Sequence, residues 1–157
     1  MNKIICIVAG DPNSINSELI FKSWKNLNLK IRKKIVIIGN YNLIKKQKNR
    51  LKININLSKI ANTDNLKADN SLKILNFPLK FKNCFNVSKR LASNYVMGCI
   101  DLAHKLSSQK KIKGFINCPI DKKLINQNNR VYGVTELLAK KSKIAKYTSS
   151  MFLLSLR

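Results

Sequence analysis

A polar turn lies near the amino terminus at residues 9–18, with the sequence AGDPNSINSE. Asp11 and Glu18 within it are two of only seven acidic residues in the 157-residue chain. The turn follows an apolar run and precedes a helix-like pattern. Ligands of parallel sheets bind beyond the carboxyl ends of the strands, so Asp11 is a candidate to shape a cleft. The competing interpretation is structural: a strand-ending turn whose acids suit the positive end of a helix dipole.

A second candidate segment begins after another strand-like run. Residues 117–123 read NCPIDKK, and residues 132–138 read YGVTELL. The first part contributes Asp121 and Lys122, and the second opens a helix with Thr135 and Glu136. Helix amino termini together with lysine favour anionic ligands such as phosphates. The structural alternative is that Thr135 only caps its helix and Lys122 is a solvated side chain.

Several well-known chemical motifs are absent from the sequence. It contains no GxGxxG, Walker, GxSxG or HExxH pattern, and its five glycines are isolated, so a glycine-built dinucleotide turn cannot form. The four cysteines lack the two-to-four spacing of zinc or redox sites, and we expect them to be reduced and mostly buried. His104 is the single histidine, so this chain alone cannot assemble a convincing metal site.

The apolar pattern predicts strands alternating with helices. Strands are expected at residues 3–9, 34–39, 53–57, 72–76, 113–119 and 147–155. Helices are expected at residues 15–27, 42–51, 87–108, 120–127 and 135–143. This alternation predicts an α/β fold with a mostly parallel sheet flanked by helices. We expect no internal domain boundary within residues 1–157. The final strand-like run ends without a cap or polar tail, so we expect the fold to be incomplete.

The chain is strongly basic, with 31 Lys and Arg residues against 7 acids and a net charge of +24. Such charge attracts phosphate backbones. However, the lysines are spread along the whole chain, and no aromatic residues alternate with arginine as in a stacking surface. Lys, Asn and Ile, the residues of A/T-rich codons, fill 67 positions. Codon bias is therefore favoured over nucleic-acid binding as the origin of the charge.

No run of 18 apolar residues is present, so no membrane helix is expected. The apolar run at the amino terminus is short and meets Gly10-Asp11-Pro12 at once, which favours a first strand over a signal peptide. We expect a cytoplasmic protein.

Taken together, the motifs resemble the 4-hydroxythreonine-4-phosphate dehydrogenase family of the pyridoxal phosphate pathway. That family reads roughly T-G-D-P-A-G-I-G-P-E near its start, then T-x-P-x-x-K, and then G-H-T-E-x-L-A. Residues 8–20 and 114–142 carry the resemblance, which extends from Lys3 to about Leu154. It covers about the first half of the family's length.

The resemblance implies a fold similar to isocitrate and isopropylmalate dehydrogenases, in a homodimer. The implied reaction is NAD-dependent oxidation of a phosphorylated small molecule, 4-phosphooxy-threonine, at its secondary alcohol, followed by decarboxylation. A divalent metal (Zn, Mg or Co) would polarise the carbinol oxygen. By the resemblance, its histidine ligands lie beyond this chain, so we expect no metal ligand in it.

The family's substrate-contacting His-Thr pair falls on Val134 and Thr135, which are therefore the expected substrate-binding positions. Asp11, Asp121, Lys122 and Glu136 are expected to shape the cleft, and no catalytic residue is assigned. Valine at 134 cannot make the hydrogen bond of the histidine it replaces. The glycines of the first motif have become Ser14 and Asn16, its later proline is Ser17, and Cys118 stands where Gly or Ala is usual.

We therefore interpret the chain as the amino-terminal part of such a dehydrogenase, and we predict that residues 1–157 alone are inactive. Two alternatives stay open. One is a non-catalytic basic α/β domain that binds nucleic acid or an acidic partner. The other is a degenerate gene remnant.

Overall fold

The computed structural model describes residues 4–64, 66, 69–125 and 133–141. Its centre is a five-stranded sheet with the strand order β3-β4-β2-β1-β5, in which every neighbouring pair is parallel. The strands are β1 (Ile5–Val8), β2 (Ile35–Gly39), β3 (Leu57–Ile60), β4 (Leu72–Asn76) and β5 (Gly114–Asn117). The predicted α/β fold with a parallel sheet is therefore confirmed.

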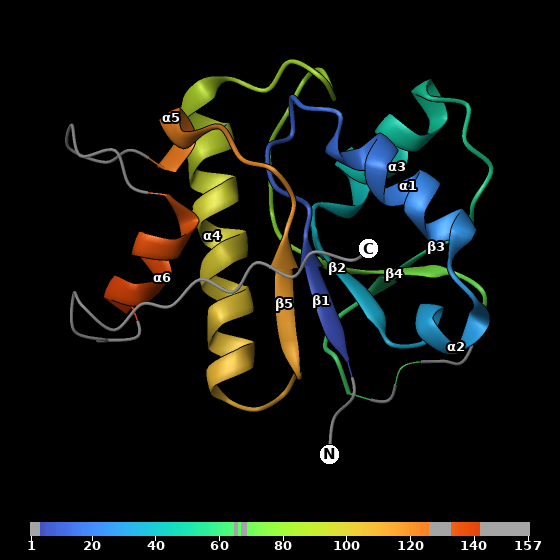
Figure 1. The fold of residues 1–157 in the computed structure, drawn as a ribbon. Coiled ribbons are helices and arrows are strands. Elements are labelled where there is room, and N and C mark those ends of the chain that lie inside the picture. The colour runs from blue at the N-terminus through green and yellow to red at the C-terminus, as the bar shows by residue number, and fades with distance from the viewer. Residues whose placement is uncertain (1–3, 65, 67–68, 126–132, 142–157) are drawn as a thin grey trace, which may run out of the picture.

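Helices cover both faces of this sheet (Figure 1). They are α1 (Asn16–Asn26), α2 (Leu29–Arg32), α3 (Tyr41–Arg50), α4 (Lys89–Ser108), α5 (Lys122–Ile125) and α6 (Val134–Lys141). Helices α1 and α3 pack on one face, and the long helix α4 packs on the other. No helix in the part of the chain that the structure describes is both long and apolar enough to cross a membrane.

The period-two alternation of strand side chains builds the two cores. Cys6, Val8 and Ile38 point toward α4 and are fully buried. Ile37 points to the opposite face, where it packs with Phe21 of α1. All five residues of β2 are buried, as expected for a central parallel strand with helices on both sides.

The chain reverses its direction of winding between β1 and β5. From β1 it passes through α1 to β2, whereas it reaches β5 on the other side of β1 through α4, on the opposite face. Such a reversal opens a crevice at the carboxyl ends of the two strands, which is where open α/β sheets bind ligands. Both candidate turns from the sequence, residues 9–18 and 117–123, begin at these two strand ends.

The predicted third strand was wrong by several residues. Strand β3 spans Leu57–Ile60 and pairs Leu57 with Leu72, so it shares only Leu57 with the expected run at 53–57. Ile55 in that run is buried against the core on the α1 face, so its alternation reflects packing without strand pairing. Helix α2 was missed because Leu29 and Ile31 are exposed and leave no apolar stripe. The strand predicted at 147–155 lies outside the described residues.

The central strand should carry much of the stability. Ile37→Ala removes a fully buried side chain from β2, and we expect it to lower the free energy of unfolding by about 2–5 kcal/mol. Ile116→Ala is the control, because Ile116 on the outer strand β5 is 58% exposed. Urea denaturation should show a much smaller loss for the control. Equal losses would contradict the placement of the core.

Candidate functional site

The turn after β1 is held by its own polar side chains. The Asp11 carboxylate accepts a hydrogen bond from the backbone N–H of Asn13 at 2.9 Å. Ser14 Oγ donates to the backbone carbonyl of Asp11 at 2.8 Å, and it accepts from the backbone N–H of Asn16 at 3.2 Å. Gly10 has a φ of +72°, a conformation that side chains with a Cβ rarely adopt. The carboxylate of Asp11 therefore shapes the turn itself.

The side chain of Asn16 joins the two candidate turns. Its Nδ2 donates to the carbonyl oxygens of Ala9, at 3.1 Å, and Pro119, at 2.8 Å. A Cβ at Gly10 would lie 2.6 Å from this Nδ2 and 3.0 Å from the Pro119 carbonyl oxygen, so only glycine allows the close approach. The structure thus brings together two segments that lie about a hundred residues apart in the sequence.

Two buried polar atoms near this junction have no hydrogen-bond partner in the described structure: Asn16 Oδ1 and Ser17 Oγ. Both residues are more than nine-tenths buried at the start of α1, whose N-cap residue, Ile15, makes no side-chain capping bond. Buried polar atoms without partners cost about 1–3 kcal/mol each. The amino end of α1 therefore contains two buried polar atoms whose hydrogen-bonding capacity is unused among the described residues.

Two further amides tie neighbouring connections to the same turn. Asn13 exchanges two hydrogen bonds with the backbone of Val87, at 2.7 and 2.8 Å. Gln47 Nε2 donates to the carbonyl oxygens of Pro12, at 2.8 Å, and Cys84, at 2.7 Å. Sequence reasoning missed the roles of Asn13, Asn16 and Gln47. Only Gln47 carried a signal, because it is a polar residue at a position where helical spacing from Leu43 requires burial.

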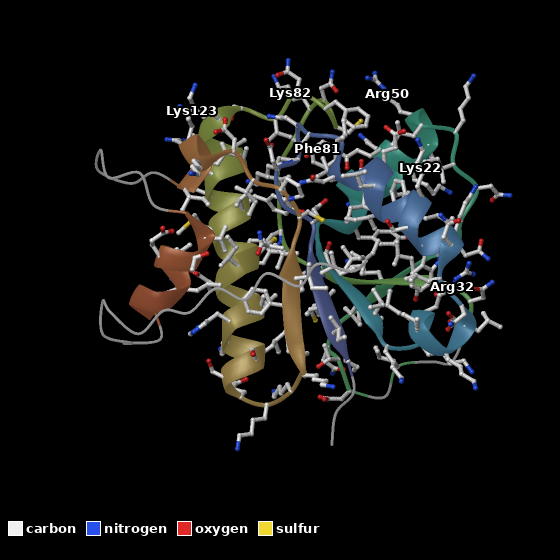
Figure 2. The ribbon with its side chains drawn as sticks, viewed as in Figure 1. Lys22, Arg32, Arg50, Phe81, Lys82 and Lys123 are labelled. Atoms are coloured by element: carbon white, nitrogen blue, oxygen red, sulfur yellow. The ribbon has the colours of Figure 1, made fainter. Side chains whose placement is uncertain are left out.

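The turn after β5 places Asp121 and Lys122 close to this junction. The exposed Asp121 carboxylate accepts from the Lys123 amide N–H at 2.9 Å and so begins helix α5. Lys122 is exposed and makes no ion pair with any described residue. Figure 2 shows Lys123 of α5 at the same end of the molecule as Lys82. Cationic side chains therefore lie around the carboxyl ends of the strands.

Helix α6 carries the remaining candidate residues on a different part of the fold. Val134 is half-buried and packs against the core on the α4 face, whereas Thr135 and Glu136 are exposed. The helix begins at Val134, so Thr135 lies in its first turn and not before it. Lys141 forms a 2.8 Å ion pair with Asp101 of α4. Figure 1 shows α6 beside α4, away from the β1–α1 turn.

Neither of the expected cofactors fits the described residues of the candidate turns. In the described ranges, no three His, Cys, Asp or Glu side chains come together as metal ligands would. The space beside Gly10, where a dinucleotide turn would admit a pyrophosphate, is filled by Asn16 and the Pro119 carbonyl.

Comparison with known proteins gives a family match. The model of the pyridoxal phosphate biosynthetic protein PdxA matches residues 30–157. A protein of Oceanobacillus iheyensis, provisionally named D-threonate 4-phosphate dehydrogenase, is 26% identical over 144 residues. That match covers 87% of this chain and 42% of the relative.

Solved structures share the fold. The 4-hydroxythreonine-4-phosphate dehydrogenase of Burkholderia phymatum aligns with a TM-score of 0.78 at 18% identity, over 91% of this chain and 44% of that one. The enzyme of the same name from Klebsiella pneumoniae aligns with a TM-score of 0.75 at 22% identity, over 90% and 45%. The chain therefore spans less than half the length of the relatives it matches.

The junction made by Asn16 can be tested by substitution. Asn16→Leu leaves the carbonyl oxygens of Ala9 and Pro119 without their hydrogen-bond donor. We therefore expect the free energy of unfolding to fall by about 2 kcal/mol. Asn42→Leu makes the same change at an exposed position of α3 and should cost far less. A urea titration that finds the two variants equally stable would contradict the junction.

Cys118 lies in the candidate crevice, but we expect it to be a poor nucleophile. Burial raises the pKa of its thiol to about 11. The thiolate fraction at pH 8 should then be roughly two-hundredfold below that of an ordinary cysteine with a pKa of about 8.5. Alkylation by iodoacetamide, followed by peptide mapping, should be slower by a similar factor than in the urea-unfolded chain. A labelling rate equal to that of the unfolded chain would refute this assignment.

Proposed function

This chain belongs to the family of the pyridoxal phosphate biosynthetic protein PdxA, and from that membership we propose that it supplies the amino-terminal part of a dehydrogenase acting on a phosphorylated hydroxy amino acid. The proposed substrate is 4-phosphooxy-threonine, in pyridoxal phosphate biosynthesis. The match over residues 30–157 carries the proposal. The names of the related proteins support the reaction class, which is oxidation of an alcohol.

The geometry of the strand ends supports ligand binding at this edge of the sheet. The turns after β1 and β5 meet through Asn16 at the reversal of winding. Asn16 Oδ1 and Ser17 Oγ are polar atoms without partners beside the two turns. We therefore propose that the substrate lies across this junction, with Asp11 and Asp121 fixing the walls.

The phosphate of the substrate needs cationic partners. Lys122 has no ion-pair partner among the described residues and stands in the turn after β5, so we propose it as one phosphate contact. Glu18 is less available as a polar contact, because its carboxylate pairs with Lys22 at 2.6 Å. Thr135 is exposed in the first turn of α6, and its hydroxyl can donate and accept hydrogen bonds.

The proposed oxidation removes a hydride from the carbinol carbon and a proton from its hydroxyl, and the resulting β-keto acid then loses carbon dioxide. By the family resemblance, NAD would be the hydride acceptor of the complete enzyme, and a divalent metal would polarise the alcohol oxygen. The candidate turns fit neither group. The proposal therefore gives Thr135 and Lys122 polar contacts with the substrate, leaves Val134 as a residue that packs against the core, and assigns none of them to the metal or the nicotinamide. The homodimer stays a prediction from the family resemblance, and the cytoplasmic location stays a prediction from the amino-terminal sequence.

The role of Thr135 can be tested in the complete enzyme. Thr135→Val keeps the shape of the side chain and removes its hydroxyl, so we expect KM for the phosphorylated substrate to rise about tenfold. The unfolding midpoint should change little because Thr135 is exposed. Thr135→Ser keeps a hydroxyl and should restore most of the affinity. An unchanged KM in Thr135→Val would eliminate this contact.

A further inference from the structure

The two faces of the sheet are covered unequally near β5. On the α4 face, Cys6 and Val8 of β1 are fully buried, and Phe115 of β5 packs against the same core. On the α1 face, the alternate residues Ile5 and Ile7 of β1 are only half-buried. Strands of a parallel sheet are normally buried by helices on both faces. The α1 face is therefore left partly open beyond β1.

Exposure on the α1 face increases outward across three neighbouring strands. Ile37 of β2 is fully buried, Ile7 of β1 is half-buried, and Ile116 of β5 is 58% exposed. These side chains form one row, because Ile7 pairs in register with both Ile37 and Ile116. Figure 1 shows α1 and α3 on the β2 side of β1, whereas β5 lies on the other side. Ile116 therefore lies beyond the two helices that cover this face.

Helix α1 adds apolar side chains to the same open region. Asn16 donates to the carbonyl oxygen of Pro119, which follows β5, so this flank of the helix faces β5. Residues three or four positions apart share one flank of a helix, and Leu19 follows Asn16 by three positions. Leu19 is exposed, as is Ile15 one turn before it. The flank of α1 that faces β5 is thus apolar and open.

Together these side chains form a continuous apolar surface, which we call the β5 strip. The strip also includes the half-buried Cys118, which packs on the α1 face directly before Pro119. Three of the five large apolar side chains that are exposed among the described residues belong to the strip. Contiguous apolar surface of this kind marks a place where another segment packs. The members of the strip are Ile7, Ile15, Leu19, Ile116 and Cys118.

The length of the related proteins indicates what covers the strip. This chain aligns over about nine-tenths of its own length but spans only 42% of the relative from Oceanobacillus iheyensis and 44% and 45% of the two solved structures. More than half of each related protein therefore has no counterpart in residues 1–157. Helices cover the other strands of this sheet on both faces, so a helix is the element that suits the uncovered row.

We propose that the part of the complete protein that lies outside residues 1–157 packs the apolar stripe of a helix onto the β5 strip. This inference rests on the proposed function, in which the chain is the amino-terminal part of a longer dehydrogenase. The strip ends at the junction that Asn16 makes with Pro119. A helix packed there adds a wall to the proposed substrate crevice, on the side that the described residues leave open.

The test compares thiol labelling in the complete enzyme and in the 157-residue chain. Ile116→Cys places a thiol in the β5 strip, and Leu29→Cys places one on α2, where the original side chain is 57% exposed. Maleimide should label both variants rapidly in the 157-residue chain. In the complete enzyme, labelling of the Ile116→Cys variant should be at least tenfold slower, and labelling of the Leu29→Cys variant should be unchanged. Peptide mapping separates each new thiol from the native cysteines.

Cys118 provides a second measurement that needs no substitution. Its alkylation by iodoacetamide should also be at least tenfold slower in the complete enzyme than in the 157-residue chain. Equal rates in the two proteins, or equal slowing of the two variants, would overturn the proposal. Protection of the Ile116→Cys variant that increases with the concentration of the 157-residue chain would overturn it too, because a second copy would then cover the strip. None of these rates depends on turnover, so an active dehydrogenase with an accessible strip would contradict this inference alone.

Discussion

The amide of Asn16 is the interaction on which the candidate site depends. A single Nδ2 group satisfies carbonyl oxygens from two turns at once, and the left-handed backbone of Gly10 leaves room for it. The side-chain amides of Asn13 and Gln47 likewise donate to backbone carbonyls, and they attach the connection before α4 and the turn after β1 to each other. Neutral amides can make such contacts without the desolvation cost of a buried charge. The edge is therefore held together without using its cations.

Because amides hold the edge together, the excess positive charge of the chain is not used in its structure there. With 31 basic and 7 acidic residues, most lysines have no acid to pair with, and the three ion pairs among the described residues use Glu18, Asp69 and Asp101. Lys122, Lys80 and Lys82 remain unpaired with described residues around the carboxyl ends of the strands. Codon bias is our interpretation of why lysine is common, and the fold leaves these three without an ion-pair partner among the described residues.

Much of the fold could be predicted from the sequence because the main strands are continuous apolar runs. β1 and β2 are such runs, β4 is a mostly apolar segment interrupted by Lys73, and the long helix α4 repeats its apolar residues at helical spacing. The start of β3 could not be predicted, since alternation at 53–57 looks the same whether Ile55 packs against a core or pairs in a sheet. The candidate site was harder to predict than the fold. Asp11 and Asp121 were expected after strand ends and lie there, but each carboxylate accepts a hydrogen bond from a nearby backbone N–H. The bridging role of Asn16 could not be distinguished among 21 asparagines.

The most direct measurement is a crystal structure of the complete enzyme with 4-phosphooxy-threonine bound. The account predicts the substrate across the junction of the turns after β1 and β5, with its phosphate near Lys122. Substrate bound away from both turns would contradict it.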